Sequence, residues 1–292
     1  MPATPTSPAT SLAASGLVLT GLICQEVGAG LAVTLFPQVG PIGMVTIRLF
    51  FSAVILMLVF RPLLRTRTGV DWVIVIAFGV ALAAMNILFY LALTRLPLGA
   101  TVTIEYLGPL VLSVVVGRRG SAWGCAVLAF AGVALLGRGG FDHLDALGVL
   151  YAAAAGVMWA AYILLSARTG RRFARLDGLA IAISVSALVL IPFGATTAGI
   201  ALLNPAVLVP GLAIAVLSST IPYGFELFAL RKLPPAVFSI LLSLTPALAA
   251  LAGLVILHQG LEMLDVVAIG LVVAASMVAV VFGNWRLRET SV

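Results

Sequence analysis

Apolar runs of about 20 residues, separated by short links that carry most of the charges, limit most strongly what this chain can fold into. A backbone inside a lipid bilayer must satisfy its own hydrogen bonds, and a run of this length matches a helix that crosses the membrane. Strands of a membrane barrel alternate polar and apolar residues, whereas these runs do not. Only 9% of the residues are charged, far fewer than in a soluble domain. We therefore predict an all-α integral membrane protein.

Helix breakers and charges divide the chain into ten expected transmembrane spans. They lie at approximately residues 12–34, 41–60, 72–93, 97–116, 121–137, 146–165, 177–196, 206–230, 234–257 and 264–284. The links between them are short, so we expect no inserted soluble domain. Residues 1–11 are rich in Pro, Ser and Thr and are expected to form a disordered tail, and residues 285–292 a cytoplasmic tail.

The basic residues indicate the orientation of the spans. If the N-terminus is cytoplasmic, most of the 16 Lys and Arg residues fall in links on the cytoplasmic side. Arg95 and Arg138 lie outside, and Arg48 lies within the second span. The positive-inside rule therefore predicts that both termini are cytoplasmic. It also accounts for the net charge of +6 without a nucleic-acid partner.

The segment Met85–Pro109 has a counterpart later in the chain. A single shift brings three of its landmarks onto three later ones: Ala92-Leu93 onto Ala229-Leu230, Leu96-Pro97 onto Leu233-Pro234, and Pro109 onto Pro246. With five spans in each copy, the second copy enters the membrane from the opposite side. We predict two inverted five-helix repeats, at residues 12–137 and 146–284. Secondary transporters use this plan to build a midplane site that opens alternately to either side.

Four charged residues fall inside the expected spans: Glu26, Arg48, Glu105 and Glu226. A charge at the centre of a bilayer costs at least about 2.5 kcal/mol, so each needs a partner or a cavity. Glu26 and Arg48 can form a structural pair that locks two helices, or either can face a substrate pathway. Low dielectric disfavours a charged carboxyl, so Glu105 and Glu226 are candidates for carrying a proton. The alternative is that a nearby hydroxyl or amide holds each acid.

Other polar residues share helix faces with one another. Asn86 and Tyr90 are four positions apart and Tyr223 and Glu226 three, so each pair lies on one face. We expect these faces to line one cavity. Trp159 lies deep in its span, where it faces either this cavity or the core.

Helix breakers and small residues also fall within the spans. Pro109 and Pro246 each remove a backbone hydrogen bond, which makes them packing kinks or gating hinges. Gly28 and Gly30 allow another helix to approach the backbone beside Glu26. The GxxxG pattern of 120–124 is compatible with helix packing or with a dimer contact, so a monomer and a homodimer both remain open.

Motifs for other classes of activity are missing from the sequence. It contains no Walker A motif, nucleophile elbow or HExxH, and its two His residues have no partner at ligand spacing. Cys24 and Cys125 fall within apolar runs and form no metal-ligand pattern. We therefore expect no cofactor, no metal and no enzymatic activity. An ion gradient or simple facilitation is the expected energy source.

Three motifs, MNILFYLALTRLPLGATVTIEYLGPL, MWAAYILLSARTG and LSSTIPYGFELFALRKLP, resemble the EamA-type branch of the drug/metabolite transporter superfamily. The likeness covers nearly the whole chain after residue 12. It implies a bacterial inner-membrane protein of ten helices that exports small amino acids and related metabolites, of the threonine and homoserine type, using the proton motive force. It also implies a central cavity lined by Glu26, Asn86, Tyr90, Glu105, Trp159, Tyr162, Tyr223 and Glu226. The chain departs from the family pattern at Thr245 and at His258-Gln259, where acids are usual.

Together these features predict a transporter that exports small zwitterions in exchange for protons. Glu105 or Glu226 would meet the ammonium, and an Arg, an amide or a half-helix N-terminus the carboxylate. The alternatives are an exporter of drugs or other metabolites with the same fold, a membrane-embedded enzyme, or a structural membrane protein.

Overall fold

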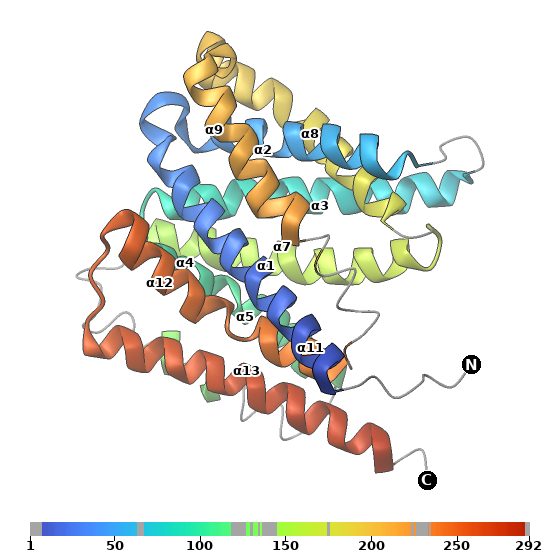
Figure 1. Ribbon diagram of the computed structural model, residues 1–292, viewed down its shortest axis with the longest axis vertical. Coiled ribbons are helices and arrows are strands. Elements are labelled where there is room, and N and C mark those ends of the chain that lie inside the picture. The colour runs from blue at the N-terminus through green and yellow to red at the C-terminus, as the bar shows by residue number, and fades with distance from the viewer. Residues whose placement is uncertain are drawn as a thin grey trace.

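The described part of the chain is built from α-helices (Figure 1). This computed structural model describes residues 8–62, 67–117, 127–128, 131–133, 135, 145–173, 176–222, 225, 233 and 235–289. The helices are α1 (Pro8–Thr34), α2 (Phe36–Phe60), α3 (Gly69–Leu93), α4 (Leu98–Glu105), α5 (Leu107–Gly117), α7 (Ala146–Gly170), α8 (Asp177–Ala198), α9 (Pro205–Ala215), α11 (Pro235–Leu242), α12 (Thr245–Leu257) and α13 (Met263–Glu289). A 3-10 helix, η2 (Gly199–Leu203), and a π-helical segment, η3 (Val216–Thr220), complete the set.

These helices confirm the predicted all-α membrane fold. Within the described ranges, six helical segments are long and apolar enough to cross a membrane, and shorter apolar helices accompany them. Where they are described, the expected spans coincide with helices; residues 121–137 and 223–230 are described at only a few positions. Two spans consist of two helices each: α4 with α5 forms the fourth membrane helix, and α11 with α12 forms the ninth. In the eighth, α9 continues into η3.

Polar residues begin several helices at the expected membrane boundaries. Thr68 and Asp71 form a capping box at the start of α3: the Asp71 N–H donates to Thr68 Oγ1 at 3.3 Å, and the Thr68 N–H donates to Asp71 Oδ2 at 2.9 Å. Asp145 caps α7 by accepting the Gly148 N–H at 2.8 Å. These bonds satisfy N–H groups that have no partner within the helix.

The contacts between helices follow the predicted repeat. If each helix is replaced by its counterpart in the other repeat, most contacts become contacts that are also present. If α1, α2, α3, α4–α5 correspond to α7, α8, α9–η3, α11–α12, then the contact of α3 with α7 corresponds to that of α1 with α9 and η3. In the same way α3 with α8 corresponds to α2 with α9, and α1 with α12 to α7 with α4 and α5. The contacts α2 with α8 and α4 with α12 join equivalent helices. This is the packing of two repeats related by a twofold axis.

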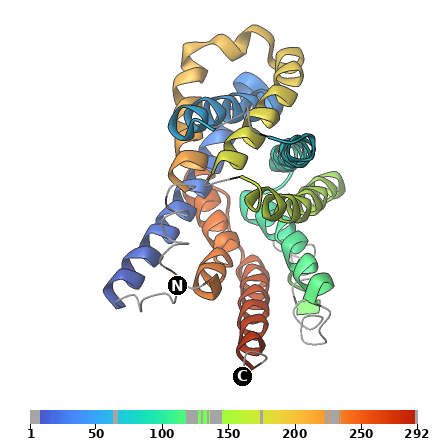
Figure 2. The same cartoon turned by 90° about the vertical axis from the view of Figure 1, so that its right-hand side faces the viewer.

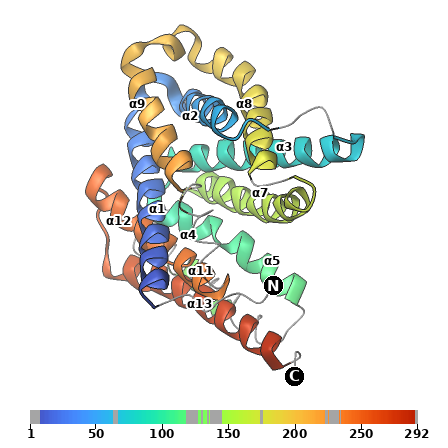
Figure 3. The ribbon, with the colours of Figure 1, turned by 45° about the vertical axis from the view of Figure 1, so that its right-hand side comes forward.

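The same arrangement is visible in the ribbon. Figures 1 and 3 show α3 lying beside α7, and Figure 2 shows α2, α8 and α9 at one end of the long axis, with α5 and α13 at the other. The apolar core has two main parts. One lies where α2 and α3 pack against α8, and the other where α4 packs against α12.

The start of α1 and the end of α13 lie on the same side of the molecule as the end of α2 and the start of α3 (Figure 1). Here ion pairs join the α2–α3 and α7–α8 links: Arg172 to Asp71 at 2.9 Å and Arg67 to Asp177 at 3.8 Å. Two basic links that the positive-inside rule assigns to the cytoplasm are thus neighbours. The orientation in the membrane remains a prediction.

Candidate functional site

The fourth and ninth membrane helices are broken at equivalent positions. The first break lies at Tyr106, between α4 and α5, and the second at Ser243 and Leu244, between α11 and α12. The shift that superposes Pro109 on Pro246 also superposes Tyr106 on Ser243. Because proline has no N–H, each proline leaves the carbonyl four residues earlier without its helical donor. These carbonyls belong to Glu105 and Leu242.

The Leu242 carbonyl receives replacement donors from both broken helices. The Tyr106 hydroxyl donates to it across the interface, and the Thr245 hydroxyl donates to it at 2.6 Å. The Tyr106 oxygen also lies 3.1 Å from Thr245 Oγ1. Trp159 on α7 packs edge-on against the Tyr106 ring, with the centroids 4.9 Å apart. The two helix breaks therefore meet at Tyr106.

The Glu105 carbonyl faces the backbone of α7 at a glycine crossing. A Cβ added to Gly108 would lie 1.9 Å from the Gly156 carbonyl oxygen, and one added to Gly156 would lie 2.6 Å from the Glu105 carbonyl oxygen. Only two glycines allow the helices to come this close. The close crossing holds the first break, with the Glu105 backbone, against α7.

Two acids are buried near this point. Glu26 on α1 and Glu105 on α4 expose only 3% and 7% of their surfaces. Glu105 lies within range of electrostatic interaction with both Glu26 and Arg48. Glu26 Oε2 has no hydrogen-bond partner among the described residues. An acid in such a setting needs a proton, a cation or a mobile partner.

Two glycines of α1 position Glu26. A Cβ on Gly28 would lie 2.2 Å from Ser218 Oγ in η3, and one on Gly30 would lie 3.1 Å from Ile256 Cδ1 in α12. The predicted close approach at these glycines is therefore confirmed. α1 lies in contact with both the eighth and the ninth membrane helices, and its Glu26 lies within electrostatic range of Tyr106.

Arg48 lies on α2 beside two polar residues of α3. Its Nη2 donates to Asn86 Oδ1, and its guanidinium carbon lies 5.0 Å from the centre of the Tyr90 ring. Asn86 Nδ2 donates to the Leu82 carbonyl at 2.8 Å, which turns Oδ1 toward Arg48. Arg48 Nε and the Tyr90 hydroxyl are buried, and neither has a hydrogen-bond partner in the part of the chain that the structure describes. Arg48 is thus held by neutral groups and forms no ion pair with Glu26 in the described structure.

Two serines connect Arg48 to the eighth membrane helix. Ser52 Oγ donates to the Arg48 carbonyl at 2.8 Å and lies 2.9 Å from Ser219 Oγ in η3. A π-helical segment widens a helix by one residue and is often found at functional sites. Sequence reasoning assigned no such connection, because serines in an apolar run carry no distinctive pattern.

The structure brings most of the predicted site residues together. Glu26, Arg48, Asn86, Tyr90, Glu105 and Trp159 come from α1, α2, α3, α4 and α7 and are joined by the contacts above. Tyr162 instead packs against Phe78 in the apolar core, with ring centroids 5.1 Å apart. Tyr223 and Glu226 lie outside the described residues.

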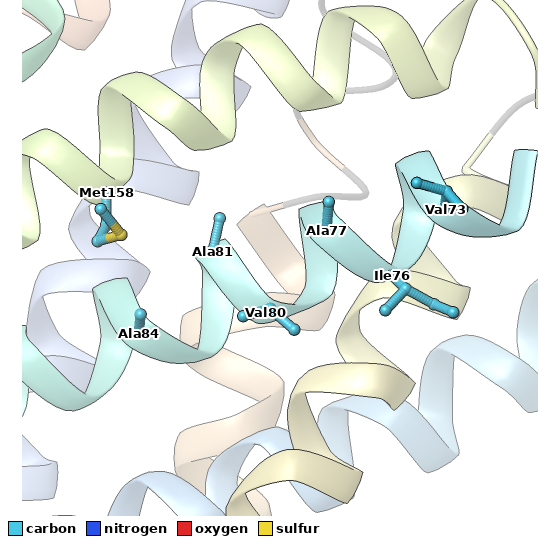
Figure 4. Close-up of a pocket in the computed structure, with 7 residues that line it drawn as sticks. All are labelled: Val73, Ile76, Ala77, Val80, Ala81, Ala84 and Met158. Carbon is cyan, nitrogen blue, oxygen red and sulfur yellow. The ribbon is translucent and has the colours of Figure 1, made fainter. Parts of the chain in front are cut away.

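A groove of about 480 Å³ lies elsewhere, on the outer face of α3 (Figure 4). Its lining is apolar: Val73, Ile76, Ala77, Val80, Ala81, Ala84 and Met158. Val73 is 68% exposed, so this face suits contact with lipid. The groove contains none of the charged residues and is no candidate for a polar substrate.

Comparison with known proteins agrees with this arrangement. Residues 146–281 match the EamA-like transporter family. The chain is 37% identical over 263 residues to the threonine/homoserine exporter RhtA of Escherichia coli strain K12, which covers 89% of each chain. It is 36% identical over 263 residues to the protein of the same name from Salmonella typhimurium strain SL1344, again over 89% of each chain.

A solved crystal structure shares the fold, with a TM-score of 0.60 at 20% identity, over 92% of this chain and 99% of the other. Its similarity covers both predicted repeats, and the resemblance seen in the sequence motifs is confirmed by the curated relatives. The chain belongs to the EamA-like transporter family.

Proposed function

We propose that this protein is a secondary transporter that exports small amino acids, such as threonine and homoserine, across a bacterial inner membrane in exchange for protons. Its 37% identity to a protein named as a threonine/homoserine exporter supports export of an amino acid or related metabolite. The observation that carries the proposal is the cluster of Glu26, Glu105 and Arg48, which are charged residues without ion-pair partners in the described membrane interior.

A zwitterion complements this cluster. Unpaired charges inside a membrane are costly, so each requires a counter-charge or a proton. The ammonium of an amino acid would lie at Glu26 and Glu105, which are within electrostatic range of each other. A substrate with opposite charges would therefore stabilise the cluster better than a neutral molecule or a simple cation.

The acid pair also supports exchange with protons. Two carboxylates in a low-dielectric site repel each other, so a proton or an ammonium must compensate them. If the two compete for the same carboxyls, the outward passage of one is coupled to the inward passage of the other. Glu226 remains a further candidate for this role.

Alternating access would be produced at the two broken helices. The breaks before Pro109 and Pro246 are equivalent in the two repeats and lie beside the acid pair, so bending there would open the cluster to either side in turn. The cytoplasmic location of both termini forms part of this proposal. The curated relatives are exporters rather than enzymes, in line with a chain that performs no chemical reaction.

The test is efflux of labelled threonine, homoserine and a panel of metabolites from proteoliposomes, with and without an imposed pH gradient. Wild type should export the amino acids faster when protons are available to enter on the opposite side. Glu105→Gln and Glu26→Gln should weaken or abolish this dependence on the gradient. Glu262→Gln makes the same chemical change at an exposed position and should behave as wild type. Equal transport of every substrate by wild type and Glu105→Gln would refute the coupling role of Glu105.

A further inference from the structure

We propose that Arg48 binds the carboxylate of the transported molecule, and that Asn86 and Tyr90 hold its guanidinium in place for this task. The proposal rests on the proposed function and adds which residue reads the substrate's negative end. It makes a free carboxylate, rather than the ammonium alone, a requirement for transport.

The first argument is the depth of Arg48. It lies within the apolar part of α2 that runs from Pro41 to Phe60, after an interruption of the helix at Gly40. At 1.5 Å per residue, Pro41 is about 10 Å away along the helix and Phe60 about 18 Å away. An Arg side chain near a helix end can extend to the interface, but from this depth it cannot. The positive charge must be compensated within the bundle.

The second argument is that the protein supplies only neutral partners. Arg48 contacts the Asn86 amide oxygen and the face of the Tyr90 ring. In the described chain, the ion pairs Arg67–Asp177, Arg95–Asp145 and Arg172–Asp71 all involve other residues. The arrangement orients a guanidinium without neutralising it. That is what a site for a mobile anion requires, whereas a purely structural arginine would have a fixed acid.

The third argument is the donor left unused. Arg48 Nε is buried, and no described residue supplies it with a hydrogen-bond acceptor. A guanidinium can bind a carboxylate through two parallel N–H groups, and such charge-assisted bonds are stronger than those between neutral groups. The partner-free hydroxyl of Tyr90, on the same face of α3, is one further donor. Within the described ranges, the nearby Glu26 and Glu105 have no fixed ion pairs either, which leaves both ends of a zwitterion with a place to bind.

The fourth argument is the rigidity of the support. Asn86 is anchored to the Leu82 carbonyl at 2.8 Å, so its amide cannot rotate freely away from Arg48. Ser52 ties the Arg48 turn of α2 to Ser219 of η3. A site held in this way discriminates strongly against analogues that lack the expected group, because its donors are then left unpaired.

The experiment is counterflow of labelled threonine into proteoliposomes that contain the purified full-length protein. The competitors are threonine, threonine methyl ester and threoninol, which share the ammonium and the side-chain hydroxyl but differ in the carboxylate. The ester and the alcohol should compete at least about 10-fold more weakly than threonine. This comparison uses only wild type, so it does not depend on a variant that folds.

Variants give the second readout. Arg48→Gln should reduce threonine counterflow by at least about 10-fold and remove the preference for threonine over its methyl ester, and Arg48→Lys should retain part of both. Arg168→Gln, a matched change at an exposed end of α7, should behave as wild type. The thermal midpoint in detergent identifies a variant that fails to fold.

The outcomes separate this inference from the function on which it rests. Threonine counterflow by wild type with equal competition from the methyl ester would overturn the inference alone, and so would wild-type selectivity in a folded Arg48→Gln. Absence of threonine and homoserine counterflow by wild type would overturn the proposed function and this inference with it.

Discussion

The Tyr106 hydroxyl of the fourth membrane helix donates a hydrogen bond to the backbone carbonyl of Leu242 in the ninth. This carbonyl lies four residues before Pro246, which cannot supply the usual helical N–H. A side chain from one repeat thereby satisfies the backbone that a proline leaves unpaired in the other. The bond joins the two helix breaks directly and places them beside Trp159 and the buried acids.

Removal of the Tyr106 hydroxyl should reveal how the broken helices share this carbonyl. Tyr106→Phe should lower the free energy of unfolding by only about 0.5–1.5 kcal/mol, because the Thr245 hydroxyl still donates to the Leu242 carbonyl. Adding Thr245→Val should cost more than the sum of the single changes, since the carbonyl then has no donor. Thermal or denaturant unfolding in detergent measures the stability of wild type, the two single variants and the double variant. Strictly additive effects would mean that the two hydroxyls do not share the carbonyl.

The crossing of Gly108 and Gly156 should tolerate no side chain. A Cβ at either position would come within 2.6 Å of the opposing backbone, and backbone cannot rotate away as a side chain can. Gly108→Ala and Gly156→Ala should therefore sharply lower the yield of folded protein, measured by size-exclusion chromatography in detergent. The control is Gly270→Ala on α13, where an added Cβ meets nothing within 4 Å. It should be neutral or stabilise by up to about 1 kcal/mol. Normal yields for both crossing variants would contradict the close approach.

Loss of stability on enlarging Gly28 should be partly reversed by a second substitution at Ser218, which it contacts. An added Cβ at Gly28 would lie 2.2 Å from Ser218 Oγ, so Gly28→Ala should lower the thermal midpoint. Ser218→Ala removes the clashing oxygen and should restore part of the loss when combined with Gly28→Ala. The same double-mutant comparison can be made for efflux, because α1 carries Glu26. A double variant no more stable than Gly28→Ala would place the cause elsewhere.

The Asp145 cap should make stability depend on pH in the acid range. The pKa of this carboxyl is below its ordinary value of 3.8, mainly because it accepts a hydrogen bond from the Gly148 N–H. The ion pair with Arg95, at 2.8 Å, lowers the pKa further. A carboxyl whose pKa is lower in the folded state than in the unfolded state stabilises the fold at pH values above its unfolded-state pKa. That contribution is lost as the pH falls through the folded-state pKa. Asp145→Asn, which keeps an acceptor for Gly148, should be slightly less stable than wild type at neutral pH. The two should converge as the pH falls below the folded-state pKa of Asp145. If the stability difference between wild type and Asp145→Asn grew as the pH fell, the ionised Asp145 carboxylate would not be the stabilising form.

The helix breaks could be predicted from the sequence, though not their positions. Pro109 and Pro246 predict a local loss of helical hydrogen bonds, and both breaks lie just before them. That Tyr106 bridges the breaks could not be predicted, because its partner is a backbone carbonyl in the other repeat. The sequence contained one indication of this contact. Tyr106 and Ser243 occupy equivalent positions in the two repeats, and each follows the residue whose carbonyl lacks its helical donor.

The partners of the buried charges were harder to predict. Glu26 and Arg48 are plausible partners by their depth in adjacent spans, yet Arg48 is oriented by Asn86. Depth follows from position in the sequence, but the direction of a side chain depends on the rotation of its helix about its own axis. Neighbouring helices set that rotation, and α2 packs mainly against α8 and α9. Tyr162 shows the same limit, since it lies near Trp159 in sequence but packs into the apolar core.

The sequence by itself determined that the chain is a helical membrane protein with two inverted repeats and buried charges. Long apolar runs admit few other ways to satisfy a backbone in lipid, and an odd number of spans in each repeat forces the inversion. The tertiary structure alone decided which charges share a site. Arg48 lies against Asn86 and Tyr90, and Glu105 lies within electrostatic range of both Glu26 and Arg48. Glycine contacts and a π-helical segment contribute to this arrangement, because they set how closely the helices approach one another.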